Sequence, residues 1–178
     1  MHPSTLPEPN LLLQRLSAAT REWLSRRGIG APLIVGIQTG GLWVAEHLAA
    51  ALGIDSGIGR LDIGFYRDDY ARTGLAPAQA PSALPWPIEN RHLLLVDDVL
   101  HSGRTVRAAL NELFDYGRPA SIGLAILVVR DGRELPIEAS ACGAELTIPA
   151  GHELKLRGPN PLRLELIAGR NIEDRGHA

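Results

Sequence analysis

A short apolar run followed directly by two acidic residues limits what this chain can fold into. Four consecutive apolar residues, 93–96, are followed by Asp97 and Asp98. The run is too short for a helix and lacks helical spacing, so it predicts a buried strand over residues 93–97. Apolar residues then recur at helical spacing over 104–116, which predicts an amphipathic helix. A buried strand, a polar loop and a helix in this order are typical of a parallel α/β sheet.

The loop between this strand and helix carries groups suited to a phosphate. Ser102, Gly103 and Thr105 lie where the helix begins, and free backbone N–H groups and the helix dipole attract anions there. Asp97 and Asp98 are expected at the carboxyl end of the strand, where open parallel sheets bind their ligands. A sugar phosphate fits this arrangement, with its diol on the carboxylates and its 5′-phosphate in the loop. The alternative is a core strand whose acidic pair caps the next helix.

The whole chain is expected to form one domain. Its 178 residues are 45% hydrophobic, enough for a sizeable core, and its net charge of −2 implies no global attraction to RNA or membrane. Residues 1–10 are expected to form a loose tail, and residues 11–178 are expected to form a single domain. The single cysteine, Cys142, excludes an internal disulfide and fits a reducing cytoplasm. No signal peptide or membrane-spanning run is recognisable, so a cytoplasmic protein is expected.

Strands and helices are expected to alternate along most of the chain, which predicts a mainly parallel sheet with helices on its faces. The last third differs, because it contains turn signals and no helical pattern. The predicted helices cover 11–27, 42–52 and 104–116, and the predicted strands cover 33–37, 58–66, 93–97, 121–129, 145–149 and 162–167.

Residues 67–90 form a long connection that contains four prolines, at positions 77, 81, 85 and 87. A connection of this length inside a compact domain is usually functional or irregular. Two interpretations remain open, a surface excursion and a mobile loop that closes over substrate and excludes water.

The strand, the two aspartates and the Ser-Gly-x-Thr loop resemble the binding signature for 5-phosphoribosyl-1-pyrophosphate (PRPP) of type I phosphoribosyltransferases. Such enzymes break the bond between C1′ and the pyrophosphate oxygen, which places positive charge on the ribose. Asp97 and Asp98 are placed to stabilise that charge, and Mg²⁺, held mainly by PRPP and also by these two carboxylates, neutralises the leaving pyrophosphate.

A glycine loop at the end of the first predicted strand is a candidate pyrophosphate site. Thr39, Gly40 and Gly41 allow backbone amides to converge on phosphate oxygens, although the same residues also form ordinary turns.

Four charged side chains are further candidates. His101 lies in the phosphate loop and is a candidate catalytic residue that contacts the base or takes its proton, since histidine titrates near neutrality. Arg104 at the helix start is expected to assist the 5′-phosphate. Arg67 is a candidate for pyrophosphate and Arg133 for the base. For His101, Arg67 and Arg133 the alternative is a solvated surface residue.

Five segments resemble the PyrR family of pyrimidine operon regulators with uracil phosphoribosyltransferase activity. They are the run from Leu95 to Leu110, Tyr116 to Pro119 with Arg133 to Ile137, and Asp62 to Asp69 with Val35 to Thr39. The resemblance covers about residues 11–140. It implies a type I phosphoribosyltransferase fold with a small hood, and the conversion of uracil and PRPP to UMP and pyrophosphate with Mg²⁺. It also implies a homodimer or larger homo-oligomer, and UMP-dependent binding to the leader RNA of pyrimidine genes.

Several positions depart from the family pattern. Gly40 stands where the family usually has arginine, Val129 where it has an acid, and Glu138 where it has arginine on the RNA-facing side. His101 stands in place of a tyrosine. The first two changes remove groups used in catalysis, and the third places a negative charge where RNA phosphates would approach. Two alternatives therefore stay open: a nucleotide-sensing regulator with weak catalysis, and a phosphoribosyltransferase for another base.

Overall fold

The computed structural model describes residues 6–64 and 81–169 of the chain. Its elements in chain order are α1 (Pro9–Arg27), β1 (Leu33–Ile37), α2 (Gly40–Leu52), β2 (Ile58–Leu61), β3 (His92–Leu100), α3 (Arg104–Tyr116), β4 (Ser121–Arg130), β5 (Ala141–Leu146), β6 (His152–Arg157) and β7 (Arg163–Ala168). The first five strands form a parallel sheet in the order β2-β1-β3-β4-β5, and β6 and β7 form a separate antiparallel hairpin. The predicted α/β class with a mainly parallel sheet is confirmed.

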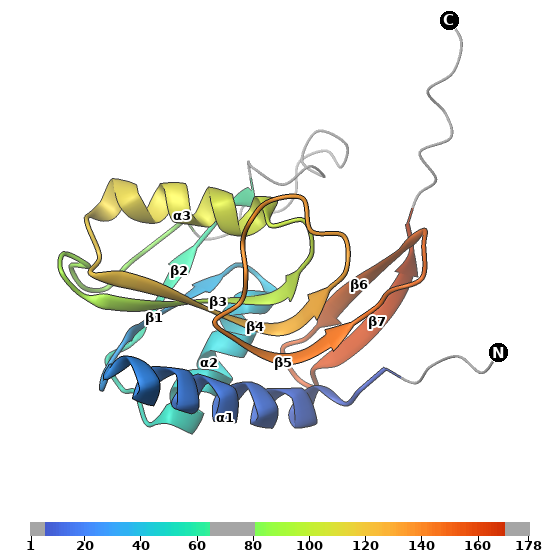
Figure 1. Cartoon of the computed structure of the whole chain (residues 1–178), viewed down its shortest axis with the longest axis horizontal. Helices are drawn as coiled ribbons and strands as arrows, with labels where there is room; N and C mark the ends of the chain where they lie inside the picture. Colours follow the sequence, from blue (N-terminus) through green and yellow to red (C-terminus); the bar gives the residue numbers. More distant parts are fainter. Residues whose placement is uncertain (1–5, 65–80, 170–178) are drawn as a thin grey trace, which may run out of the picture.

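Three layers result from the packing of helices on both faces of the sheet. α3 covers one face and α1 and α2 cover the other, while the β6–β7 hairpin lies past the ends of β3 and β4 (Figure 1). Side chains of a strand alternate between its two faces, so each central strand contributes to two cores. In β3, Leu94 and Val96 pack toward α1 and α2, whereas Leu93 and Leu95 pack toward α3.

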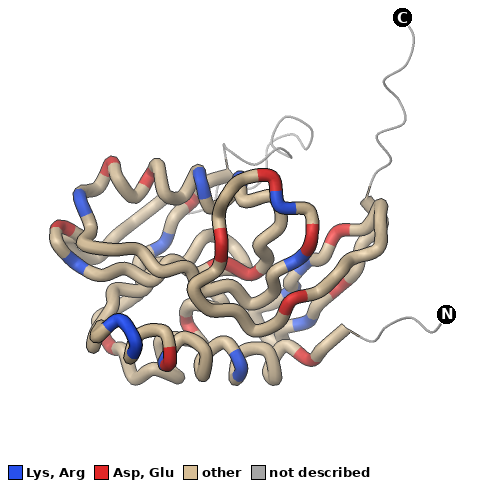
Figure 2. The backbone as a smooth tube through the Cα atoms, in the orientation of Figure 1, with Lys and Arg blue, Asp and Glu red and all other residues tan. Residues whose placement is uncertain are grey.

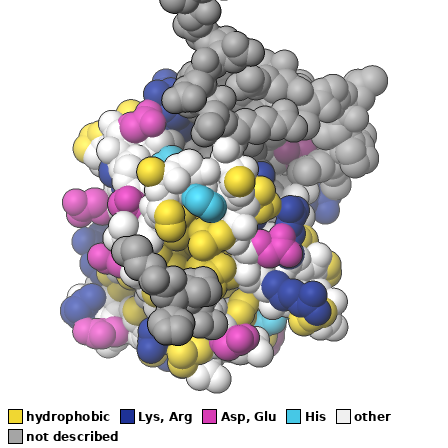
Figure 3. Space-filling model, turned by 90° about the vertical axis from the view of Figure 1, so that its right-hand side faces the viewer, with side chains coloured by type: hydrophobic (Ala, Val, Ile, Leu, Met, Phe, Trp, Pro, Cys, Tyr) yellow, Lys and Arg dark blue, Asp and Glu magenta, His cyan; other side chains and the backbone are white. Residues whose placement is uncertain are grey.

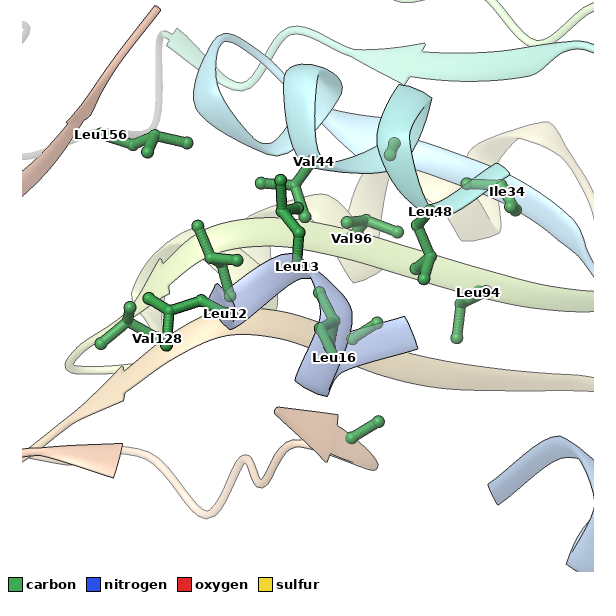
Figure 4. Close-up of a cluster of buried hydrophobic side chains, with 14 of the residues drawn as sticks. Leu12, Leu13, Leu16, Ile34, Val44, Leu48, Leu94, Val96, Val128 and Leu156 are labelled. Atoms are coloured by element: carbon green, nitrogen blue, oxygen red, sulfur yellow. The ribbon is translucent and has the colours of Figure 1, made fainter. Parts of the chain in front are cut away.

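The core beneath α1 and α2 also holds the hairpin in place. Leu12 and Leu16 of α1 and Val44 of α2 meet Val128 of β4 in this cluster, and Leu156 of the hairpin reaches it from the side (Figure 4). Each of these five side chains is almost fully buried. Apolar burial of this kind is the dominant favourable contribution to folding, so the hairpin is attached to the domain by its core.

The central strand β3 is longer than the sequence predicts, and this corrects the expected position of the aspartates. β1 pairs with β3 only as far as Gly36 opposite Val96, whereas β4 continues to pair with β3 up to Val129 opposite Leu100. Asp97 and Asp98 therefore lie within the strand, three and two residues before its last residue, rather than at its end. At these two residues β3 no longer pairs with β1, and the start of α2 packs against β3 in place of that strand.

Two other boundaries differ from expectation for local reasons. α1 begins at Pro9, inside the predicted tail, because proline at the first helical position needs no N–H partner. β2 ends at Leu61 rather than at residue 66, since its partner β1 ends at Ile37, which lies opposite Leu61. Residues 65 and 66 lie outside the described part of the chain.

The carboxyl-terminal third contains one strand more than predicted. β5 lies four residues before the expected strand at 145–149 because it pairs with β4, beginning with Ala141 opposite Ala125. β7 matches the expected strand at 162–167, while β6 is not predicted at all. No helix lies between residues 131 and 169, all of which are described.

Only the last ten residues of the long connection at 67–90 belong to the described structure. Ala83 forms an isolated antiparallel bridge with Arg60, and the indole N–H of Trp86 donates to the carbonyl of Ser56 at 2.9 Å. This part of the connection is therefore packed beside β2. Residues 67–80 of this connection, including Arg67, lie outside the described residues, so neither interpretation of the connection is tested. Within the described ranges no helix is both long and apolar enough to cross a membrane.

Candidate functional site

A cavity of about 720 Å³ lies between the carboxyl ends of the central strands and the β6–β7 hairpin. Thr39, Gly40, Asp97, Asp98 and the loop 101–105 all line it. The structure thus brings together most of the predicted site from three separate segments. Figure 2 shows acidic and basic residues on the same side of the molecule, where β3 and β4 meet the hairpin.

The two aspartates have different environments. Asp97 is only 2% exposed, whereas Asp98 is half-buried. Oδ1 of Asp97 accepts a hydrogen bond from the N–H of Asp98, and Oδ1 of Asp98 accepts one from the N–H of Val99, both at 3.0 Å. Hydrogen bonds from backbone N–H groups stabilise and orient ionised carboxylates. Asp98 is therefore the more accessible of the pair, and Asp97 is the one held more deeply.

The glycines at the start of α2 allow this helix to approach the aspartates closely. A Cβ atom on Gly40 would overlap the carboxylate of Asp98, and one on Gly41 would lie 2.6 Å from the carbonyl oxygen of Val96. Gly41, a predicted pyrophosphate residue, does not line the cavity; it packs against β3 instead. Gly40 faces the cavity and leaves its floor without a side chain.

The loop 101–105, the candidate phosphate loop, turns through a glycine that must adopt a left-handed conformation. Gly103 has a φ of 94° and precedes the first residue of α3. Its neighbour Ser102 accepts a hydrogen bond from the N–H of Arg104 through its hydroxyl at 3.3 Å. The first N–H groups of α3 point toward the cavity end of the helix, where they have no carbonyl of a preceding turn to bond. This geometry suits a phosphate.

A segment after β4, Arg133–Ile137, braces the phosphate loop from outside. The N–H groups of Glu134 and Leu135 both donate to the carbonyl of Ser102 at 3.0 Å. The carboxylate of Glu134 also binds Arg104, at 2.8 Å from Nε and 2.7 Å from Nη2. Arg104 therefore lines the cavity with its guanidinium already paired. Arg133 does not line the cavity.

His101 lies at the cavity wall among several charged groups. A Cβ atom on Gly132 would approach its Nε2 to 2.7 Å, which places the imidazole beside the turn after β4. Burial lowers the pKa of His101 below its ordinary value of 6.5, and the positive charge of Arg130 lowers it further. This shift favours the neutral imidazole, which is the form that can accept a proton.

The sequence reasoning missed the opposite wall of the cavity. Residues 152–158, which comprise β6 and the glycine after it, line this wall together with Trp43 of α2 and Arg130 of β4. The signal that was available is the alternation of polar and apolar residues from Glu153 to Arg157, which is typical of a strand with one face buried. This strand pairs only with β7, in a hairpin separate from the parallel sheet, so the alternation of strands and helices along the chain does not predict it.

The residues of this site fit a Mg²⁺ ion that is bound mainly by the phosphates of the substrate. Within the described residues no group of three or more His, Cys, Asp or Glu side chains is placed to hold a metal by itself. Mg²⁺ usually binds through one or two carboxylates together with substrate phosphates. Asp98 and Asp97 supply the carboxylate oxygen atoms at the cavity wall.

Comparison with known proteins agrees with this geometry. The family model for the phosphoribosyl transferase domain matches residues 10–150. The chain is 53% identical to the bifunctional protein PyrR of Pseudomonas fluorescens over 162 residues, which cover 91% of this chain and 96% of that protein. It is 55% identical to the bifunctional protein PyrR of Pseudomonas paraeruginosa strain DSM 24068 / PA7 over 161 residues, with 90% and 95% covered.

Solved structures share the fold at much lower sequence identity. A hypoxanthine-guanine phosphoribosyltransferase (hpt-2) of Bacillus anthracis superposes with a TM-score of 0.62 at 15% identity, covering 80% of this chain and 81% of that one. A hypoxanthine phosphoribosyl transferase of Trypanosoma cruzi gives 0.58 at 22% identity, with 83% and 79% covered. The predicted type I phosphoribosyltransferase fold is confirmed by these matches. The matching family model and the PyrR relatives at 53–55% identity show that this chain is a phosphoribosyltransferase of the PyrR family.

Proposed function

We propose that the cavity transfers the phosphoribosyl group of PRPP to uracil, giving UMP and pyrophosphate. The observation that carries this proposal is the meeting of three segments at one cavity: the aspartates of β3, the loop at the start of α3 and the glycine turn before α2. Each segment suits one part of PRPP, namely the ribose diol, the 5′-phosphate and the pyrophosphate. The PyrR family provides the choice of uracil as the base.

The assigned roles follow the position of each group. Asp98, the more exposed carboxylate, binds the ribose hydroxyls, while buried Asp97 fixes the strand and adds negative charge below the sugar. The 5′-phosphate lies at the amino end of α3, where Ser102, Gly103, Arg104 and Thr105 offer hydroxyl, guanidinium and backbone N–H groups. The pyrophosphate lies at Thr39 and Gly40, with Gly41 setting the approach of the helix to β3.

The reaction breaks the bond between C1′ and the pyrophosphate oxygen and forms a bond between C1′ and N1 of uracil. The bonding electrons leave with pyrophosphate, and the proton on N1 passes to neutral His101, whose lowered pKa keeps it unprotonated. The carboxylates stabilise the positive charge that develops on the ribose. Bound Mg²⁺ would neutralise the leaving pyrophosphate.

Pyrophosphate release tests this proposal. With Mg²⁺, PRPP and uracil, Asp98→Asn is expected to lower kcat/KM by about 100-fold or more, because a charge that stabilises the transition state is lost. Asp55→Asn, on an exposed loop away from the cavity, is the control and should keep wild-type activity. Equal activity of Asp98→Asn and the control would contradict the assigned role.

A base panel separates the enzyme from its alternatives. Uracil, orotate, hypoxanthine, adenine and guanine are each offered with PRPP and Mg²⁺, and pyrophosphate is measured. Activity with uracil alone supports the proposal, whereas activity with another base reassigns the substrate. UMP binding without turnover on any base would favour the nucleotide-sensing regulator, in keeping with Gly40 and Val129 at positions of the family's arginine and acid.

We also propose that the chain contributes to pyrimidine regulation by binding leader RNA when UMP is present. On the face shown in Figure 3, basic and acidic side chains lie around a central group of hydrophobic ones, so this face offers no uniformly positive patch. Glu138, on the segment after β4, is exposed. RNA affinity should therefore be modest, rise with UMP and fall with salt. Glu138→Arg should strengthen it, and filter binding across a salt series measures both effects.

A further inference from the structure

Among residues 6–64 and 81–169, the turn before α2 at the pyrophosphate end of the proposed site has no positive side chain of its own. The turn before α2 reads Gln38-Thr39-Gly40-Gly41, and Gly40 leaves no room for a side chain beside Asp98. Pyrophosphate carries several negative charges, and Asp97 and Asp98 add two more at the same wall. A cation from another element is therefore needed to balance an anion bound there.

The cations on the far side of the cavity are committed to other positions. Arg104 at the phosphate loop is paired with Glu134. Arg130 at the end of β4 donates from Nη1 to the carbonyl of His152 at 3.2 Å, which ties it to the first residue of β6. Both lie toward the ends of β3 and β4, away from the turn before α2.

Strand β6 crosses the cavity from β4 to α2, and this course places its last residues near the turn. Its first residue, His152, is bonded to Arg130. At the other end, a Cβ atom on Gly158 would lie 2.8 Å from Cε3 of Trp43, which lies one helical turn after Gly40. Arg157 directly precedes Gly158 and lines the cavity.

Resting on the proposed function, we propose that Arg157 binds the pyrophosphate of PRPP from the hairpin side. Its Nε donates to Oε2 of Glu165 at 3.0 Å, and both side chains are about half exposed. Because Nε forms this bond, the two terminal nitrogen atoms remain able to donate to an anion in the cavity. Glu165 does not line the cavity, so it holds the guanidinium at the edge until an anion competes for it.

Lys155 is a secondary contributor on the same face of β6. Residues 153, 155 and 157 alternate with the buried Leu154 and Leu156, so they share the opposite face of the strand. Nζ of Lys155 lies 3.2 Å from Oε2 of Glu153, and both residues line the cavity. The one charged nitrogen atom of Lys155 lies beside Glu153, whereas Arg157 bonds Glu165 through Nε and has two further nitrogen atoms that can donate, which makes Arg157 the better candidate.

Calorimetry on the full chain with Mg²⁺ tests this assignment, with pyrophosphate and UMP as separate probes. Arg157→Gln should weaken pyrophosphate binding by about 10-fold or more, the size expected for a hydrogen bond to a charged group. UMP binding should change less than about 2-fold, since UMP has no pyrophosphate. Arg163→Gln is the matched control, because Arg163 lies directly opposite Arg157 in the hairpin and does not line the cavity.

Two further variants make the test independent of folding defects. Arg157→Lys should restore much of the pyrophosphate affinity, because the charge is kept. Glu165→Gln should strengthen pyrophosphate binding by a few-fold, because it releases the guanidinium from a surface ion pair.

The possible outcomes separate this inference from the proposed function. Loss of pyrophosphate binding in Arg157→Gln alone supports it. Equal loss of UMP and pyrophosphate binding, equal effects of Arg157→Gln and Arg163→Gln, or binding of UMP without any binding of pyrophosphate by the wild-type chain would overturn it. The last of these outcomes leaves the nucleotide site intact. Failure of the wild-type chain to bind either UMP or PRPP would overturn the proposed function itself.

Discussion

The charge state of His101 depends on its burial and on charged residues at and just after the end of β4. Burial lowers its pKa most, and the positive charge of Arg130 lowers it next; Glu134 and Asp131 oppose this lowering, and Arg133 adds the smallest effect, also a lowering. The folded-state pKa therefore lies below that of the unfolded chain. It follows that the contribution of His101 to the free energy of unfolding is complete above pH 6.5 and is lost as pH falls through the folded pKa.

An NMR titration of the imidazole ring should show this shift directly. The midpoint for His101 is expected below 6.5, and Arg130→Gln should raise it, because a neighbouring positive charge is removed. Arg118→Gln, beyond the end of α3, serves as the control and should leave the midpoint unchanged. A midpoint at or above 6.5 in the wild-type chain would show that the ring is not desolvated as described.

At the scale of elements, the contact between α2 and the sheet depends on a residue without a side chain. Gly36 of β1 lies beneath the first turn of α2, where an added Cβ atom would be 2.7 Å from Cα of Leu42 and 3.0 Å from the carbonyl oxygen of Gly41. Both neighbours are backbone atoms, which cannot rotate away. The helix can approach β1 this closely because position 36 is glycine.

Gly36→Ala should therefore lower the free energy of unfolding by about 1–3 kcal/mol, the usual cost of overpacking a core. Gly30→Ala provides the comparison, because an added Cβ atom there would meet no atom within 4 Å. That variant should stay within about 0.5 kcal/mol of wild type. Urea unfolding measures both, and equal stability of the two variants would contradict the close packing of α2 on β1.

The sequence predicts those elements best whose pattern is local. β1 and α3 have the predicted bounds, since an unbroken apolar run and a regular amphipathic period define them. β3 runs past its predicted end because pairing with β4 continues beyond the aspartates, which interrupt the apolar pattern. β6 escapes prediction because its alternating residues include three charged side chains and it has a single partner strand.

At the scale of the whole molecule, the cavity depends on how firmly the hairpin is attached. Leu154 and Leu156 of β6 are each 6% exposed and belong to the core that also contains α1 and α2. The two aspartates and the phosphate loop follow from one stretch of sequence, whereas the wall formed by β6 depends on this distant packing. For that reason the sequence predicts the aspartates and the loop at the start of α3 but not the basic side chains of β6 across the cavity.

Leu156→Ala should loosen the hairpin more than the rest of the domain. The expected loss of stability is about 2–5 kcal/mol, typical of a buried leucine. Hydrogen exchange at residues 152–168 should increase more than in β1 and β3, because the hairpin loses its anchor while the sheet keeps its own core.

Leu166→Ala is the matched control, since Leu166 lies on the same apolar face of the hairpin but is 38% exposed. It should cost less than about 1 kcal/mol. A uniform increase in exchange across the domain in Leu156→Ala would mean that hairpin and sheet unfold as one unit.

The pairing of β1 with β3 joins Leu33 to Leu93, residues separated by α2, β2 and the long connection. Closing such a large loop costs chain entropy before the stabilising contacts form, and contacts so remote in sequence slow folding. Since Asp98 meets Gly40 only after this closure, a nascent or partly folded chain has nowhere to hold a nucleotide. A nucleotide that binds only the folded protein would then slow unfolding and leave the folding rate unchanged.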